Sequence, residues 1–287
     1  MEEPVYRIEE LKRIKSIARK LLVKRKDEGY KHPSTPRAVI AELLYPKLLL
    51  HLESVLVLME SETRIDFAAL ASVSRMIMEH HNVYYYLCGR GVTNHMFEFR
   101  YLLYDFHGSH ETSRILRRLG FGDREDNHFG YFSGIKEWLE NRLIEDPYFL
   151  SLNQKEKRRV ITGKSAFFFS GDDKKHEAIP ANIESGIYKL FSNSTHSYSL
   201  GVDMVLDGSE LRHINTMSLL FLVIETCIVF ASSMIKGYCT MRWKIAQNLS
   251  ENDKNFIKTM TTSHSIGEWV EFRKSFRAQQ LRKTTNC

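Results

Sequence analysis

Hydrophobic positions recur with a helical period along most of the chain. Between residues 64 and 88, apolar or small side chains follow the spacing of one buried helix face, and the segment 5–28 repeats that pattern beside a basic face. No stretch alternates apolar and polar residues as a half-buried strand would. We therefore predict an all-α protein, a multi-helix bundle around a central apolar helix, with little or no sheet.

Capping and breaking residues set the expected limits of the helices. Thr35 and Pro36 begin a helix that runs to about Met59, with a kink or break at Pro46, and Gly89 to Gly91 end the helix that follows. Further helices are predicted at 93–107, 111–119, 133–145, 147–152, 153–162, 182–195, 209–236 (ending at Gly237), 251–262 and 266–283. Residues 121–131 are predicted to form a loop. Residues 165–170 are predicted to form either a short extended piece or an aromatic plug inserted into the protein.

No linker or repeat divides the sequence, so a single helical domain is expected over residues 1–287. Within it, a basic N-terminal helix and turn (1–36) precede the core bundle (37–237) and two basic C-terminal helices (238–287).

One segment, 216–235, is apolar for twenty residues except for Glu225, which is long enough to span a bilayer. A carboxylate at its midpoint is costly in lipid, and flanking Lys and Arg are sparse. We predict a central buried helix and no membrane insertion.

Composition indicates a soluble protein in the cytoplasm. The four cysteines show no metal-binding or paired spacing, and the N-terminus does not read as a signal peptide. The net charge is +6, with both ends basic and the centre slightly acidic. Basic ends suit binding to nucleic acid or to an anionic surface, or they are solvated helix faces.

A polar line runs beside the apolar face of the 64–88 helix. Arg75, Glu79, Asn82 and Tyr86 lie at i, i+4, i+7 and i+11, so they share one side of the helix. Because the helix is apolar around most of its circumference, we expect these groups to be held inside the bundle. Arg75 and Glu79 form either a simple intrahelical ion pair or part of a site that binds an anion such as phosphate.

Arg75 and His80 have the spacing Arg-x4-His, which resembles the motif of HEPN-type helical ribonucleases, many of them toxins or phage-defence effectors. The resemblance covers this helix alone and implies metal-independent RNA cleavage across the interface of a homodimer. Histidine would handle the 2′-hydroxyl proton and arginine would stabilise the phosphorane. On a helix the two residues are about 140° apart, and Met76 stands where the family usually has a polar residue.

Tyr188, Ser192 and His196 follow the pattern Tyr-x3-Ser-x3-His about a hundred residues after Arg75 and Glu79. Together these motifs resemble a bacterial family of all-helical proteins of unknown function, over about residues 40–235. The resemblance implies a helical fold and a shared polar site. Alternatively, His196 only complements the end of its helix. A Ser192–His196 nucleophile is conceivable, but the glycine elbow of a hydrolase is missing.

The last predicted helix alternates aromatic residues with Arg273, Lys274 and Arg277, which suits RNA stacking and phosphate contact or, equally, an amphipathic packing helix. The sequence has no HExxH motif, no phosphate loop and no dinucleotide fingerprint, so neither a metal nor a cofactor is expected.

The leading hypothesis is an RNA-cleaving defence or toxin protein, with Arg75, Glu79, His80, Ser192 and His196 as catalytic residues. Tyr188, Arg273, Lys274 and Arg277 would bind the substrate. The alternative is a non-catalytic helical scaffold or binding protein whose polar residues lock the bundle together.

Overall fold

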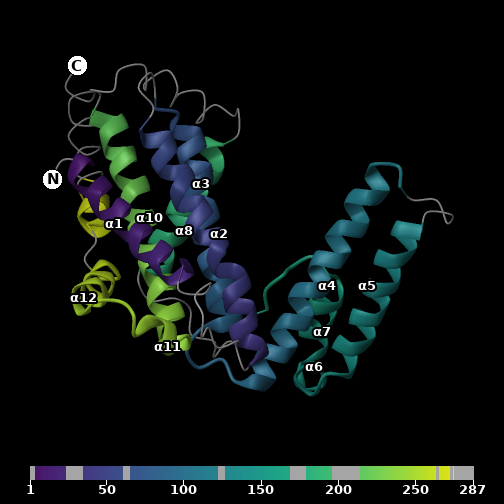
Figure 1. Cartoon of the computed structure of the whole chain (residues 1–287). Coiled ribbons are helices and arrows are strands. Elements are labelled where there is room, and N and C mark those ends of the chain that lie inside the picture. The colour runs from purple at the N-terminus through teal and green to yellow at the C-terminus, as the bar shows by residue number, and fades with distance from the viewer. Residues whose placement is uncertain are drawn as a thin grey trace, which may run out of the picture. The chain divides into compact units, whose positions relative to one another are not determined.

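The computed structural model describes residues 4–23, 35–60, 65–121, 127–168, 179–195, 214–262, 265–271 and 274. Every regular element in these ranges is an α-helix, which confirms the predicted all-α class (Figure 1). The helices are α1 (Pro4–Val23), α2 (Pro36–Met59), α3 (Phe67–Cys88), α4 (Asn94–Arg118), α5 (Asn127–Glu145), α6 (Pro147–Ser151), α7 (Gln154–Ile161), α8 (Ala181–Ser194), α10 (Ile214–Met241), α11 (Trp243–Ala246) and α12 (Glu251–Met260). Residues 266–271 form a further helical segment.

The chain divides into two compact units. Unit 1 comprises residues 1–85 and 175–287, and unit 2 comprises residues 86–174. The first boundary falls inside α3, so a continuous helix joins the units and no Gly- or Pro-rich linker marks the division in the sequence.

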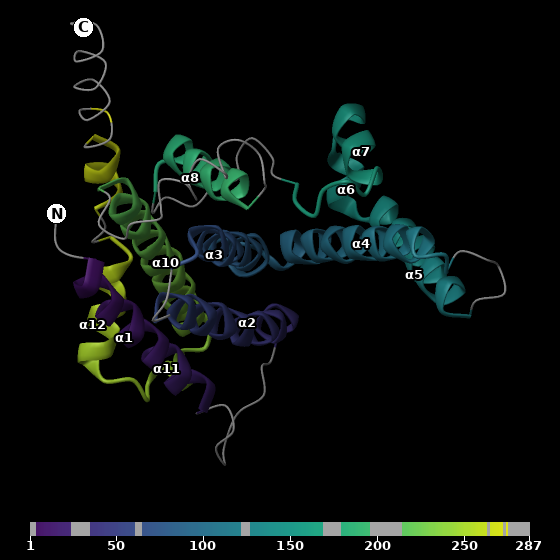
Figure 2. The same cartoon turned by 90° about the horizontal axis from the view of Figure 1, so that it is seen from above.

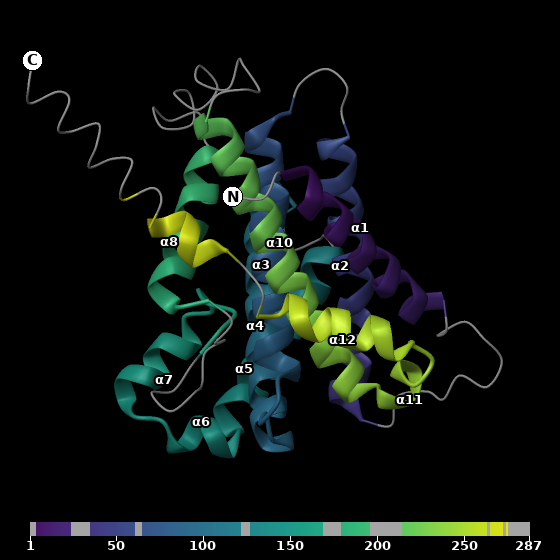
Figure 3. The ribbon, with the colours of Figure 1, turned by 90° about the vertical axis from the view of Figure 1, so that its left-hand side faces the viewer.

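In unit 1 the other helices surround α10. Figures 2 and 3 show α10 in the middle of the unit, with α1 and α12 on one side and α3 and α8 on the other. Residues 222–224 and 227–231 of α10 are all fully buried, because their side chains are apolar or small on every side of the helix. This arrangement supplies the central apolar helix that the sequence predicted.

The stretch Ser218–Met241 is, among the described helices, the one long and apolar enough to cross a membrane. In this structure 89% of its most apolar 18-residue window is buried by protein, as in the core helix of a soluble bundle, so its composition is weak support for a membrane span.

α2 begins with the predicted Thr35 cap and runs as one helix through Pro46, so of the kink or break predicted there the break does not occur. One boundary in unit 1 differs from its prediction. α10 continues past Gly237 to Met241, whereas the sequence predicted that Gly237 would end it. An added Cβ at Gly237 would stand 2.9 Å from Cε1 of Tyr84, so the glycine serves close packing of α3 on α10.

Unit 2 is a helical hairpin of α4 and α5 with the short helices α6 and α7 (Figure 1). α4 is one helix of 25 residues where two were predicted, because Gly108 is accommodated inside it; Gly120, at φ 88°, follows its end. α5 begins at Asn127, inside the predicted loop 121–131. The core of the unit consists of Phe99, Leu103, Phe106, Leu139, Leu143, Phe149, Val160 and Phe168.

Of the segment 165–170, predicted as a short extended piece or an aromatic plug, residues 169 and 170 lie outside the described residues, and the described part packs into unit 2. Phe168 is buried against Phe99, and its backbone N–H donates to the hydroxyl of Tyr86 at 3.2 Å. Tyr86 is therefore fully buried within unit 2 and does not extend the polar line of α3.

Candidate functional site

The predicted polar line of α3 lies against α8. Arg75, Glu79 and Asn82 occupy successive turns of α3, and Ser192, Tyr188 and Glu184 occupy successive turns of α8 in the opposite direction. Residues three or four apart share one face of a helix, so two antiparallel helices with this spacing pair their polar side chains turn by turn. We call these six residues the α3–α8 cluster.

Arg75 is the centre of the cluster. Its Nε donates to Oε1 of Glu79 at 2.9 Å, and its Nη1 donates to the hydroxyl of Ser192 at 3.2 Å. Cζ lies 4.8 Å from the centre of the Tyr188 ring, within the range of a cation–π contact. The guanidinium is therefore oriented from both helices.

Tyr188 and Asn82 complete the connection between the helices. The Tyr188 hydroxyl donates to Oε1 of Glu79 at 2.7 Å, so this oxygen accepts from both Arg75 and Tyr188. Nδ2 of Asn82 donates to Oε1 of Glu184 at 3.3 Å. The side-chain oxygen of Asn82 lies 3.3 Å from Nδ1 of the buried His81.

The cluster is half-exposed, which corrects the expectation that its groups would be enclosed by the bundle. The side chain of Arg75 is 29% exposed and that of Glu79 is 43% exposed. Hydrogen bonds to Glu79 and Ser192 use two of the five guanidinium N–H groups, and no described residue donates to Oε2 of Glu79. The cluster therefore has a cationic donor and a carboxylate oxygen within reach of solvent.

The electrostatics of the cluster follow from its contacts. Burial has the largest single effect on Arg75 and lowers its pKa, but the hydrogen bond and the charge of Glu79, together with Tyr188, outweigh it in sum, and the net pKa is raised. Burial and the hydrogen bond to Glu79 both raise the pKa of Tyr188. At neutral pH the cluster therefore holds a fixed cation and a protonated phenol that donates to the carboxylate.

His80 lies on a different side of α3. Its Nε2 is 2.7 Å from the carbonyl oxygen of Leu44 in α2, and the side chain is buried beside His51. Burial lowers the pKa of His80 to about 4. Because a carbonyl only accepts, the neutral ring carries its proton on Nε2. His80 and Arg75 bind different partners and do not contact each other, in keeping with their separation of about 140° around the helix.

The other sequence-predicted residues are distributed as follows. His196, Arg273 and Arg277 lie outside the described residues. Lys274 is exposed and forms an ion pair with Glu271, at 2.6 Å, within its own segment. Tyr188, predicted to bind substrate, joins the cluster together with Ser192.

Sequence reasoning missed Glu184. The available signal was its spacing, because it precedes Tyr188 by four residues and Ser192 by eight, on the same face of α8.

Two histidines of unit 2 surround Gly163. Nδ1 of His107 lies 2.7 Å from the Gly163 carbonyl oxygen, and an added Cβ at Gly163 would stand 3.0 Å from Cγ of His110. This is close packing of α4 on the end of α7. Over the described ranges, no group of three or more His, Cys, Asp or Glu residues is arranged to hold a metal ion.

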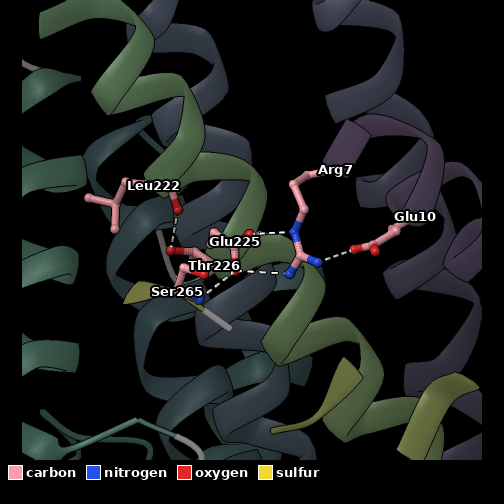
Figure 4. A network of polar contacts seen from close by, with 6 residues as sticks. All are labelled: Arg7, Glu10, Leu222, Glu225, Thr226 and Ser265. Atoms are coloured by element: carbon pink, nitrogen blue, oxygen red, sulfur yellow. Dashed lines mark hydrogen bonds and ion pairs between the residues drawn. The ribbon is translucent and has the colours of Figure 1, made fainter. Parts of the chain in front are cut away.

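A second arginine–glutamate network lies inside unit 1 (Figure 4). Glu225 of α10 is fully buried, and its two oxygens accept from Nε and Nη2 of Arg7 at 2.5 and 3.1 Å. The backbone N–H of Ser265 also donates to Glu225, at 3.1 Å, and Arg7 pairs in addition with Glu10. Glu225, the one charged residue in the apolar segment 216–235, thus connects α10 with α1 and with the segment before residues 266–271.

Comparisons of the chain with protein family models, with curated proteins and with solved structures find no match.

Proposed function

We propose that this protein is a metal-independent ribonuclease whose α3–α8 cluster holds a phosphodiester of RNA. The observation that supports the proposal most is the half-exposed Arg75–Glu79 pair, oriented by Tyr188 and Ser192 from a second helix. Cleavage of RNA by its own 2′-hydroxyl requires a base for that proton and positive charge beside the phosphorus. A carboxylate and a guanidinium four residues apart on one helix meet both requirements.

In the proposed reaction, Oε2 of Glu79 accepts the proton of the 2′-hydroxyl while O2′ attacks the phosphorus. Arg75 stabilises the negative charge that develops on the phosphoryl oxygens. The bond to the 5′-oxygen breaks, and this oxygen receives a proton from a general acid, which leaves a 2′,3′-cyclic phosphate. We assign the general acid to His196 from the sequence alone, since it follows Ser192 by four residues.

His80 takes no part in this chemistry in our proposal. Its ring packs on α2, its Nε2 faces a backbone carbonyl, and it is neutral near pH 7. The HEPN resemblance therefore contributes Arg75 to the proposal, while the Tyr-x3-Ser-x3-His pattern contributes the partners on α8.

The alternative is a non-catalytic protein in which the cluster only fastens α8 to α3. It is favoured by one observation, that Glu79 already neutralises Arg75. An exposed ion pair of this kind contributes about 0.2–1 kcal/mol to stability. A contribution of this size fits a catalytic pair as well as one that only fastens α8 to α3.

The test is incubation of the purified protein with RNA in EDTA, with detection of 2′,3′-cyclic phosphate ends. We expect Arg75→Ala and Glu79→Gln each to lower the cleavage rate by about 100-fold, and DNA of the same sequence to be left intact because it lacks the nucleophile. His196→Ala tests the assigned acid in the same assay.

The chain offers matched control variants. Arg114 lies on α4, is 54% exposed and pairs with Glu111 three residues before it, so Arg114→Ala removes a comparable arginine away from the cluster. Glu251→Gln alters an exposed carboxylate that pairs with Lys254. Both should cleave at the unsubstituted rate. Absence of cleavage by the unsubstituted protein, or equal cleavage by all variants, would overturn the proposal.

A further inference from the structure

The outward face of α2 carries an apolar seam without a described partner. Leu43 is 63% exposed, Leu50 is 62% exposed and Val57 is 69% exposed, and Val39 continues the seam at 40%. The opposite face of the same helix already packs in unit 1 through Ala41, Tyr45, Leu48, Leu52 and Val55, all fully buried. A helix that is apolar around most of its circumference is ordinarily covered around most of it, so the outward face of α2 lacks a neighbour among the described residues.

The spacing of the seam is that of a helix–helix contact. Leu43, Leu50 and Val57 are seven residues apart, which matches the 3.5-residue repeat of supercoiled helices. With one apolar side chain every two turns, the apolar surface of the seam is narrow. The exposed Lys47 lies beside it, between Leu43 and Leu50. A helix that lies on a lipid surface presents a wider apolar face, with Trp or Phe and a basic polar side.

The seam is also symmetrical about Leu50. Leu43 and Val57 are equally far from it, so an identical helix running in the opposite direction sets Leu50 against Leu50 and Leu43 against Val57. Lys47 precedes Leu50 by three residues and Glu53 follows it by three. In an antiparallel pair, Lys47 of one copy therefore lies at the same level along the helix axis as Glu53 of the other. In a parallel pair, the two Lys47 side chains would lie at one level and the two Glu53 side chains at another.

We propose that α2 is an interface between two copies of this chain, packed antiparallel about a twofold axis at Leu50. Two-fold packing of one patch on itself is the commonest route to a closed dimer. The proposal is independent of any activity at the α3–α8 cluster. Because the seam is narrow, we expect a weak dimer whose population rises with protein concentration.

Sedimentation equilibrium over a concentration series tests the dimer. Leu50→Glu sets two carboxylates together on the axis, and we expect it to raise the dissociation constant by at least about tenfold. The matched control is Leu150→Glu, since Leu150 of α6 is 58% exposed and lies in unit 2. A monomer at every concentration, or equal effects of the two substitutions, would overturn the proposal.

Cysteine cross-linking tests the antiparallel register. Leu50→Cys should form a disulfide-linked dimer by itself under mild oxidation. Leu43→Cys and Val57→Cys should each stay monomeric alone and should cross-link when mixed, above the background of the unsubstituted protein. Efficient self-linkage at all three positions would show a parallel pair instead and overturn the arrangement.

Flotation with vesicles tests the competing occupant. Vesicles of phosphatidylcholine with 0 or about 30% phosphatidylserine should leave the protein in solution if the seam faces a second copy. Binding to vesicles that Leu50→Glu abolishes and Leu150→Glu preserves would assign the seam to lipid, against the proposal.

Discussion

Two of the arginine–glutamate pairs in unit 1, Arg7–Glu225 and Arg75–Glu79, differ in burial. Glu225 of α10 is fully buried. It accepts hydrogen bonds from Arg7 of α1 and from the backbone N–H of Ser265, so its network joins three parts of the unit. Glu79 is 43% exposed, and its pair with Arg75 spans one turn of a single helix. The same two side-chain types thus lie in two environments: the buried pair joins separate elements of the unit, whereas the Arg75–Glu79 pair is open to solvent.

The largest effect should come from breaking the buried pair. Glu225→Ala leaves the Arg7 guanidinium buried without its main acceptor, and we expect the free energy of unfolding to fall by about 3–5 kcal/mol. Urea unfolding measures this effect. Glu251→Ala, which alters an exposed carboxylate, is the control and should cost less than about 0.5 kcal/mol. A small loss in Glu225→Ala would remove the contrast between the two pairs.

Breaking the exposed Arg75–Glu79 pair should instead reduce activity and leave stability nearly unchanged. Arg75→Ala should lower RNA cleavage by about 100-fold, equal to about 2.7 kcal/mol of transition-state stabilisation, and change the free energy of unfolding by less than about 1 kcal/mol. Cleavage rates and urea unfolding on one preparation separate the two effects. If stability fell by several kcal/mol, the pair would be a structural lock like Arg7–Glu225.

His80 extends the comparison between buried and exposed groups. It is a buried titratable residue that directly follows the exposed Glu79 on α3. Its pKa in the folded protein is about 4, below the usual 6.5, so folding favours the neutral ring. The associated stability is present above pH 6.5 and is lost as the pH falls towards 4, by about 2–3 kcal/mol.

This pH dependence can be measured directly. Urea unfolding of the protein and of His80→Gln at pH 7.5 and at pH 4.5 should show a smaller pH effect in the variant, whose amide can still donate to Leu44. Equal pH effects in both proteins would contradict burial of His80.

The smallest effect is expected at Tyr188. Tyr188→Phe keeps the ring under the Arg75 guanidinium and removes the hydrogen bond to Glu79, so stability should fall by about 0.5–1.5 kcal/mol. Cleavage should fall by less than in Arg75→Ala, since the hydroxyl only orients the carboxylate. Unchanged cleavage and stability would show that Tyr188 has no part in the cluster.

Local spacing made much of the α3–α8 cluster predictable. Arg75 and Glu79 share a face of one helix, and Tyr188 and Ser192 share a face of another, so periodicity grouped each set correctly. Nothing in either helix shows how much solvent reaches the contact between them, which is why the cluster was expected to be enclosed.

Contacts between distant parts of the sequence could not be predicted. Arg7 and Glu225 are 218 positions apart, and no periodic signal joins them. Glycines were also ambiguous: Gly237 was predicted to end α10 but lies within it beneath Tyr84, because its small size serves packing there. Gly89 and Gly91, by contrast, do follow the end of α3, and Gly91 has a φ of 96°.

The most direct measurement of the central claim is a paired one on Glu79→Gln, in which the amide keeps the shape of the side chain and loses its charge. We expect RNA cleavage in EDTA to fall about 100-fold while the free energy of unfolding stays within about 1 kcal/mol of the unsubstituted protein. Full cleavage activity accompanied by a large loss of stability would contradict a functional role for the cluster.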